Sequence, residues 1–112
     1  MKHISTLLIS ISILALSGCS SKPDYAQLNK DNSLKYISNT FEKNKTLDTY
    51  KAMAITIDTN GRSAIGYSHD AKSQKSANER AIKRCNLAKQ QANLNSLCTI
   101  YAEGDTIIQE LK

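Results

Sequence analysis

Apolar and polar residues alternate with a period of two along residues 50–69. The alternation predicts two half-buried strands, and the Asn60-Gly61 pair between them is typical of a two-residue hairpin turn, because both residues tolerate a positive φ. In the resulting register, Ala64 and Gly66 are small residues on a face that a helix could approach closely. That face is expected to hold Met53, Ile55, Ile57, Ala64 and Gly66, and the opposite face Ala54, Thr56, Ile65 and Tyr67.

A long amphipathic helix is predicted over residues 72–93, which are rich in the helix-forming residues Ala, Lys, Gln and Arg. Ser73 or Ser76 can cap its start, and Ser76 with Glu79 forms an S-x-x-E capping box. Its apolar side consists of small residues at spacings of three and four, which predicts close packing on a sheet. These residues are Ala77, Ala81, Cys85, Ala88 and Ala92.

Two further strands follow this helix. Residues 98–103 alternate again and predict a third strand, with Cys98, Ile100 and Ala102 on one face and Tyr101 on the other. A turn at Glu103-Gly104-Asp105 and the apolar residues after it predict a short last strand at 106–108.

Upstream of the hairpin, residues 31–45 predict a short amphipathic helix, because Leu34, Ile37 and Phe41 lie at helical spacing. The alternative is a partly ordered extension of the preceding segment. Together the elements predict an α+β fold. A small antiparallel sheet (β-hairpin, third strand and short last strand) would carry one long helix packed on one face and a short N-terminal helix.

The N-terminus has the features of an export signal. Lys2 precedes an apolar run at residues 4–16, which is too short to cross a bilayer core of about 30 Å but typical of the apolar region of a signal peptide. The run ends in Leu16-Ser17-Gly18-Cys19. This tetrapeptide resembles the lipobox of bacterial lipoproteins, L-[AST]-[GA]-C, at all four positions. An ordinary cleaved signal and a buried helix with a chance cysteine are the alternatives.

The resemblance implies a lipid anchor. Residues 1–18 would be a signal peptide, and the thiol of Cys19 would carry a diacylglyceryl group, with further acylation of the new N-terminus. Ser20 stands where an Asp would retain a lipoprotein at the inner membrane, so the resemblance implies an outer-membrane lipoprotein facing the periplasm. Residues 19–30 are then expected to form the lipidated cysteine and a flexible tether, and residues 31–112 a single small domain.

Lipidation of Cys19 leaves two of the three cysteines, Cys85 and Cys98. A bacterial domain outside the cytoplasmic membrane lies in a compartment that permits disulfides. Because the chain reverses between the long helix and the third strand, we expect a Cys85–Cys98 disulfide, which would stabilise the fold by about 3 kcal/mol on the chain-entropy model.

Residues 50–108 also resemble a small Cys-paired domain of unknown function found in secreted and periplasmic bacterial proteins. That domain combines an A-x-A strand, a D/N-G turn, a G-[YW] strand, a helix ending in A-x-x-x-C and a C-x-[IVL]-[YF]-A strand. The matching positions are Ala52, Ala54, Asn60-Gly61, Gly66-Tyr67, Ala81, Cys85, Cys98 and Tyr101-Ala102. The resemblance implies a fold but brings no established activity.

Two groups of residues are candidates for a binding surface. The first is the basic side of the long helix, which includes Lys83 and Arg84. This side could bind an anionic partner, or it could be an ordinary solvated helix face. The full basic set is Lys72, Lys75, Arg80, Lys83, Arg84 and Lys89. The second is Tyr67 and Tyr101, which together with Ile65 would form an exposed patch unless the N-terminal helix covers them, as we expect.

No recognised catalytic motif occurs in the chain. Asp58 and Asp70 are better explained by a turn and a loop. His69 could pair with a cysteine as a nucleophile, or join Asp70, Cys85 and Cys98 at a zinc ion, but the spacing supports neither arrangement. We therefore expect neither enzymatic activity nor a cofactor.

Length and charge narrow the class of protein. A chain of 112 residues with a net charge of +5 excludes a large multidomain enzyme and a polytopic membrane protein. A non-enzymatic lipoprotein that binds an envelope protein or an anionic envelope polymer is expected. An inhibitor or immunity lipoprotein that neutralises a toxin or lytic enzyme is the alternative. Nucleic acid is not an expected partner, because aromatic residues are not interleaved with the basic ones.

Overall fold

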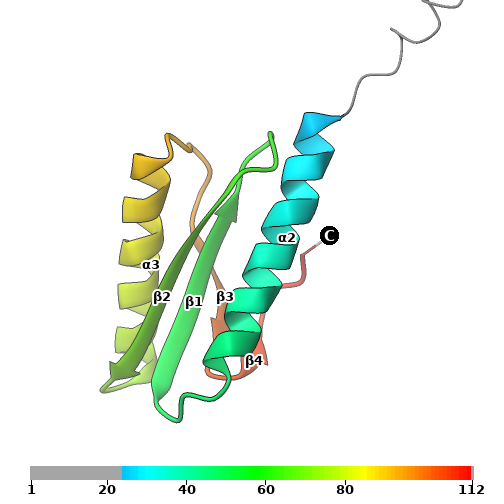
Figure 1. Cartoon of the computed structure of the whole chain (residues 1–112). Coiled ribbons are helices and arrows are strands. Elements are labelled where there is room, and N and C mark those ends of the chain that lie inside the picture. Colours follow the sequence, from blue (N-terminus) through cyan, green and yellow to red (C-terminus); the bar gives the residue numbers. More distant parts are fainter. Residues whose placement is uncertain (1–23, 112) are drawn as a thin grey trace, which may run out of the picture.

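The computed structural model describes residues 24–111 (Figure 1), so the signal peptide predicted at 1–18 and the lipidation predicted at Cys19 lie outside the described residues. Within this part of the chain the fold is α+β, as predicted, with two helices and a four-stranded antiparallel sheet of order β2-β1-β3-β4. The elements are α2 (Tyr25–Asn44), β1 (Tyr50–Ile57), β2 (Ser63–Ala71), α3 (Gln74–Gln91), β3 (Thr99–Glu103) and β4 (Thr106–Ile107).

The two helices lie on opposite faces of the sheet (Figure 1). Alternate residues of the central strand β1 point to opposite faces, so it contributes to two separate hydrophobic clusters. Under α2 lie Ile37, Phe41, Met53, Ile55, Tyr101 and Ala102. Under α3 lie Ala52, Ala54, Ala77, Ala81, Cys85 and Cys98.

The hairpin turn is longer than predicted. Asp58 donates its N–H to the carbonyl of Arg62 at 2.8 Å, and its carboxylate accepts the N–H groups of Asn60 and Arg62, each at 2.9 Å. These bonds close a loop over Asp58–Arg62, and Ile57 pairs with Ser63 rather than with Ala64. The predicted register, with Asn60 and Gly61 alone as loop residues, is therefore wrong by one position on β2.

A one-residue shift moves every side chain of a strand to the other face of the sheet. Ala64 and Gly66 consequently share a face with Ala54, and Ile65 and Tyr67 share the face of Met53. The predicted composition of the two hairpin faces is wrong for β2. The expectation that the small residues admit a helix is confirmed, since a Cβ added to Gly66 would collide with the backbone of α3 at Ala81 and Cys85.

Helix α3 is capped by Ser73, one of the two caps that the sequence predicts. The Ser73 side chain accepts the N–H of Ser76 at 3.1 Å, and Gln74 is the first helical residue. The predicted capping box of Ser76 and Glu79 is wrong, because Ser76 lies inside the helix rather than at its cap. Ala77, Ala81 and Cys85 are buried as expected, whereas Ala92 forms the C-cap and is exposed.

Helix α2 begins earlier than predicted. Its cap is Asp24, whose carboxylate accepts the N–H of Gln27 at 3.2 Å. Residues 25–30, which we expected in the tether, are therefore helical. Ile37 and Phe41 are buried against the sheet, so the expectation that this helix covers the face opposite to α3 is confirmed.

The early turns of α2 pack on the hairpin turn by polar contacts. Asn29 donates its side-chain amide to the carbonyl of Asn60 at 3.1 Å, and the Ser33 hydroxyl donates to that of Gly61 at 2.6 Å. Gly61 has φ +79°, and a Cβ there would collide with the α2 backbone at Ala26. This approach of two backbones requires glycine.

A β-bulge changes the predicted faces of β3. Met53 pairs with Ala102 and Ala54 with Ile100, which leaves Tyr101 as the extra residue. Ala102 therefore joins Tyr101 in the cluster under α2, and its predicted place beside Ile100 is wrong. The short last strand is confirmed as β4, Thr106–Ile107, after a turn with Gly104 at φ +59°.

A buried lysine joins three parts of the fold. The Lys51 side chain is 4% exposed and lies 2.6 Å from the carboxylate of Asp105, in the β3–β4 turn. It also donates to the carbonyl of Asn44, the last residue of α2, at 2.7 Å and to that of Leu47, in the loop after α2, at 2.6 Å. Every donor of this ammonium group has an acceptor, which a buried lysine needs.

Candidate binding surfaces

The predicted disulfide between Cys85 and Cys98 is present in the structure. The two Cα atoms are 6.1 Å apart, and the bond spans 13 positions of the chain. It links the buried side of α3 to the residue that precedes β3. In the disulfide neither sulfur is a thiolate, and the thiolate is the form that acts as nucleophile or metal ligand.

The acidic and histidine candidates lie at the two ends of the hairpin. Asp58 is in the turn, where Arg62 pairs with its carboxylate at 3.1 Å. At the far end, the His69 ring lies 2.8 Å from the exposed carboxylate of Asp70. The structure therefore does not bring Asp58 and Asp70 together. Among residues 24–111, no three His, Cys, Asp or Glu side chains gather where they could hold a metal ion.

The two candidate tyrosines lie under α2. Tyr101 is buried and forms a T-shaped pair with the Phe41 ring, with the ring centroids 6.0 Å apart. Its burial, together with the nearby carboxylate of Glu42, raises the pKa of the Tyr101 hydroxyl. Tyr101 therefore offers no exposed contact surface, and the expectation that the helix covers it is confirmed.

Tyr67 is half-buried on the same face of the sheet. Its hydroxyl is buried without a hydrogen-bond partner in the described part of the protein. Burial raises the pKa of this hydroxyl, and the negative charges of Asp105 and Asp70 raise it further. The phenol therefore keeps its proton to a higher pH than an exposed tyrosine does.

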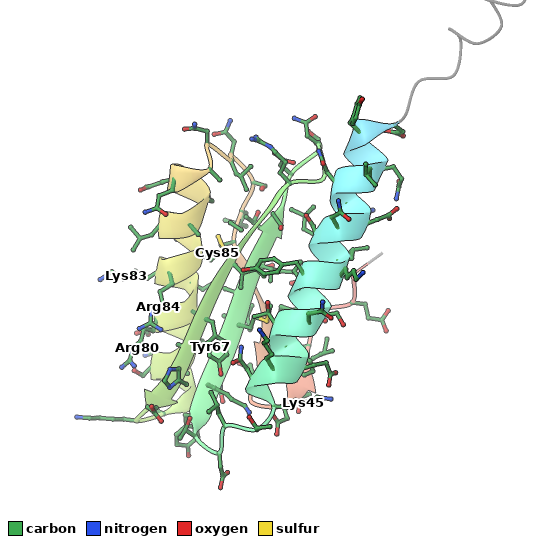
Figure 2. All side chains as sticks on the ribbon, in the orientation of Figure 1. Lys45, Tyr67, Arg80, Lys83, Arg84 and Cys85 are labelled. Atoms are coloured by element: carbon green, nitrogen blue, oxygen red, sulfur yellow. A yellow bond between two sulfur atoms is a disulfide. The ribbon has the colours of Figure 1, made fainter. Side chains whose placement is uncertain are left out.

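The basic residues of α3 remain as an exposed surface (Figure 2). Arg80, Lys83 and Arg84 lie on the side of α3 that faces away from the sheet core, and we call these three residues the α3 basic surface. Within the described residues none of the three forms an ion pair with a carboxylate. Their charges are thus available to an anionic partner.

The α3 basic surface borders a free sheet edge. Strand β2 is one of the two edge strands of the sheet, and Arg84 donates to the carbonyl of Tyr67 at 2.6 Å. Arg80 makes a longer bond, 3.4 Å, to the carbonyl of His69. Both carbonyls therefore point away from β1, and the arginines satisfy them where a further strand would otherwise pair.

The other three basic residues of the predicted set differ in their exposure. Lys72 and Lys75 are exposed near the start of α3. Lys89 is half-buried and donates to the carbonyl of Ser96 at 2.8 Å, so it holds the loop after the helix. The basic face predicted from the sequence is therefore smaller than the six residues suggest.

Two surface features of the structure were not predicted from the sequence. One is an open hollow of about 650 Å³ at the end of the hairpin, lined by Asp48, Thr49, Tyr50, Asp70 and Ala71. The other is an exposed apolar strip on α2 that includes Tyr25, Leu28 and Tyr36. Their helical spacing could have revealed the strip, but two of these residues lie in the segment assigned to the tether.

Comparison of the chain with protein-family models, with curated proteins and with solved structures finds no match. In the described part of the chain, neither helix combines the length and apolar character needed to cross a membrane. The candidate surfaces therefore rest on the geometry of this chain alone.

Proposed function

We propose that this protein is a lipid-anchored lipoprotein of the bacterial cell envelope, and that its domain binds a partner without catalysing a reaction. The observation that carries the proposal is the tetrapeptide Leu16-Ser17-Gly18-Cys19 directly after a signal-type apolar run. Ser20 supports the outer membrane, with the domain in the periplasm. The Cys85–Cys98 disulfide supports a location outside the cytoplasm.

The α3 basic surface is the proposed binding site. Its three cations are exposed, share one side of a helix and have no carboxylate partner within residues 24–111. The disulfide fixes that helix to the sheet, so little conformational freedom is lost when a partner binds. An acidic envelope protein or an anionic envelope polymer matches this charge.

An inhibitor or immunity lipoprotein is the second candidate. The same rigid basic surface would suit the acidic substrate cleft of a lytic enzyme or toxin. A gene for such an enzyme next to this one would favour the second candidate over a structural binding module. Survival of cells that express the toxin, only when this protein is present, would establish it.

The anchor is tested by mass spectrometry of the protein purified from membranes. We expect the N-terminal peptide to begin at Cys19 and to carry diacylglycerol and an amide-linked acyl chain. The Cys19→Ala variant should lose the lipid and leave the membrane fraction. An unlipidated chain that still contains residues 1–18 would overturn the proposal.

The binding surface is tested by crosslinking in intact envelopes. We expect Lys83→Glu with Arg84→Glu to reduce recovery of the crosslinked partner at least tenfold. The matched control is Lys72→Glu with Lys75→Glu, which makes the same charge change near the start of α3 but outside the α3 basic surface, where both lysines are also exposed. Equal recovery from both double variants would refute the α3 basic surface as the binding site.

A further inference from the structure

Helix α2 has a second side that the sheet does not cover. Ile37 and Phe41 face the sheet and are buried, whereas Tyr25, Leu28 and Tyr36 are 67%, 50% and 58% exposed. At about 3.6 residues per turn, these three side chains fall within roughly 80° of the helix circumference. Singly exposed apolar residues are ordinary, but a strip along one helix side is not.

Two lysines lie along the same strip. Lys35 and Lys43 are exposed and project within or next to it at the same helical spacing. We call Tyr25, Leu28, Lys35, Tyr36 and Lys43 the outer face of α2. Tyrosine, leucine and lysine on one side of a helix are typical of helices that lie on a membrane surface, where the ring and alkyl groups enter the headgroup region and the ammonium groups meet lipid phosphates.

The acidic residues of α2 are engaged elsewhere. Asp31 accepts the side-chain amide of Gln27 at 2.9 Å, and Glu42 lies 3.3 Å from the ammonium of Lys45. Both fall to one side of the strip on the helical projection. Asn32 and Asn39, both exposed, also fall within the strip. The outer face of α2 therefore combines apolar, cationic and uncharged polar side chains without a carboxylate, which matches an anionic lipid surface.

The length of chain before α2 restricts where this face can be. The helix cap, Asp24, follows Cys19 by five positions, and a fully extended chain of that length spans at most about 18 Å. Helix α2, which begins at Tyr25, lies on the face of the sheet opposite to α3 (Figure 1). A lipid on Cys19 would thus hold Tyr25 and Leu28 close to the bilayer.

We propose that the outer face of α2 lies on the membrane in which the protein is anchored, with anionic phospholipid headgroups as its partner. This inference rests on the proposed lipidation of Cys19. The short connection makes contact with lipid effectively intramolecular, so a small apolar face is sufficient for binding. The α3 basic surface then points away from the bilayer, because the sheet separates the two helices.

The test uses tryptophan as a depth reporter, since the chain contains no Trp. Leu28→Trp places the reporter on the outer face of α2. Leu87→Trp is the matched control, because Leu87 on α3 is 53% exposed against 50% for Leu28. Both variants of the purified lipidated protein are reconstituted into vesicles of phosphatidylethanolamine and phosphatidylglycerol that contain brominated acyl chains.

We expect the bromine atoms to quench the tryptophan of Leu28→Trp several-fold more strongly than that of Leu87→Trp. Replacing Lys35 and Lys43 with Gln should weaken the quenching on α2, as should vesicles without phosphatidylglycerol. Equal quenching in both variants, stronger quenching on α3, or none in either would overturn the inference. The last result would leave the outer face of α2 open to a protein or to a second copy of the chain.

Mass spectrometry of the same samples separates the two proposals. A chain without lipid on Cys19 refutes the proposed anchor. A lipidated Leu28→Trp variant whose tryptophan is not quenched refutes only the placement of α2 on the membrane.

Discussion

On one face of β1, Ala52 and Ala54 lie beneath α3, and on the other, Met53 and Ile55 lie beneath α2. The α3 face is built from Ala, Gly and a disulfide, which bring the helix backbone almost onto the strands. The α2 face is built from Ile, Phe, Met and Tyr, which hold their helix through buried apolar area. Small side chains bury little area each, so a covalent bond stabilises the side of the fold that most needs it.

The difference makes the two faces sensitive to opposite changes. Added atoms cannot be accommodated beneath α3, because backbone lies directly against backbone. Removing side-chain atoms should lower stability more beneath α2, because each large side chain there contributes much of the contact. The following predictions test this contrast, beginning with the largest effect.

The largest effect is expected from Gly66→Val beneath α3. The new side chain would collide with the backbone at Ala81 and Cys85, so we expect a loss on the order of 4 kcal/mol in the free energy of unfolding. Urea unfolding followed by circular dichroism measures it. Gly104→Ala is the control, because its Cβ meets nothing within 4 Å and only the positive φ is strained, at about 1 kcal/mol. Equal losses would contradict close packing of α3.

Loss of the disulfide is expected to be the next largest effect. Replacing both Cys85 and Cys98 with Ala should lower the free energy of unfolding by about 3 kcal/mol, because the unfolded chain regains the freedom of the open loop. The free energies of unfolding of wild type with and without reductant should differ by the same amount, whereas reductant should leave the double variant unchanged. A double variant as stable as the oxidised wild type would show that the bond is dispensable.

A smaller effect is expected beneath α2. Ile37 is completely buried, and Ile37→Val removes one methylene from its cluster, which should cost about 1 kcal/mol. Ile108→Val makes the same chemical change at a position 52% exposed and should cost almost nothing. If Ile37→Val were also neutral, α2 would not be held by packing of its buried side.

The smallest effect concerns the pH dependence of the α2 face. The pKa of Tyr67 is raised by burial and by nearby carboxylates, so the folded protein keeps this proton more tightly than the unfolded chain does. The resulting stability is complete below pH ~10, the ordinary tyrosine value, and is lost as the pH rises towards the folded-state pKa. Tyr67→Phe should therefore make the alkaline loss of stability less steep.

The same variant should be neutral or slightly stabilising near pH 7, because it removes a buried hydroxyl that has no partner among the described residues. Urea midpoints between pH 7 and pH 11 measure both effects. Tyr50→Phe, at a tyrosine 54% exposed, is the control. A steeper alkaline loss in Tyr67→Phe than in wild type would contradict the predicted sign.

The regular elements were predictable because hydrophobic periodicity determines them. The strands and the long helix follow from spacing. The sequence offered Ser73 and Ser76 as caps, of which the structure uses Ser73, and the disulfide was expected because lipidation of Cys19 leaves one pair of cysteines across a chain reversal. The hairpin register did not follow, because the Asp58 carboxylate binds two backbone N–H groups and so enlarges the turn. The bulge at Tyr101 also left no signal in the alternation, since it depends on pairing with β1.

The candidate surfaces were predictable only where charge alone defines them. Lys83 and Arg84 could be assigned to the exposed side of α3 from the helical pattern. The start of α2 could not be found, because its early turns pack by polar contacts from Asn29 and Ser33 to a turn far along the chain. Lys51 was missed for a similar reason: its partners come from the end of α2, the loop after it and the distant β3–β4 turn.

The polar contacts at the two ends of α2 also determine how the domain carries mechanical load. Asn29 and Ser33 fasten the beginning of the helix to the hairpin turn, and Lys51 fastens the chain at its end. A pull on Asp24 along the helix axis must slide α2 across the sheet against both attachments at once. The packing of Ile37 and Phe41 also resists this movement. Because the disulfide joins α3 to the chain before β3, we expect α2 to detach before the strands and α3 separate.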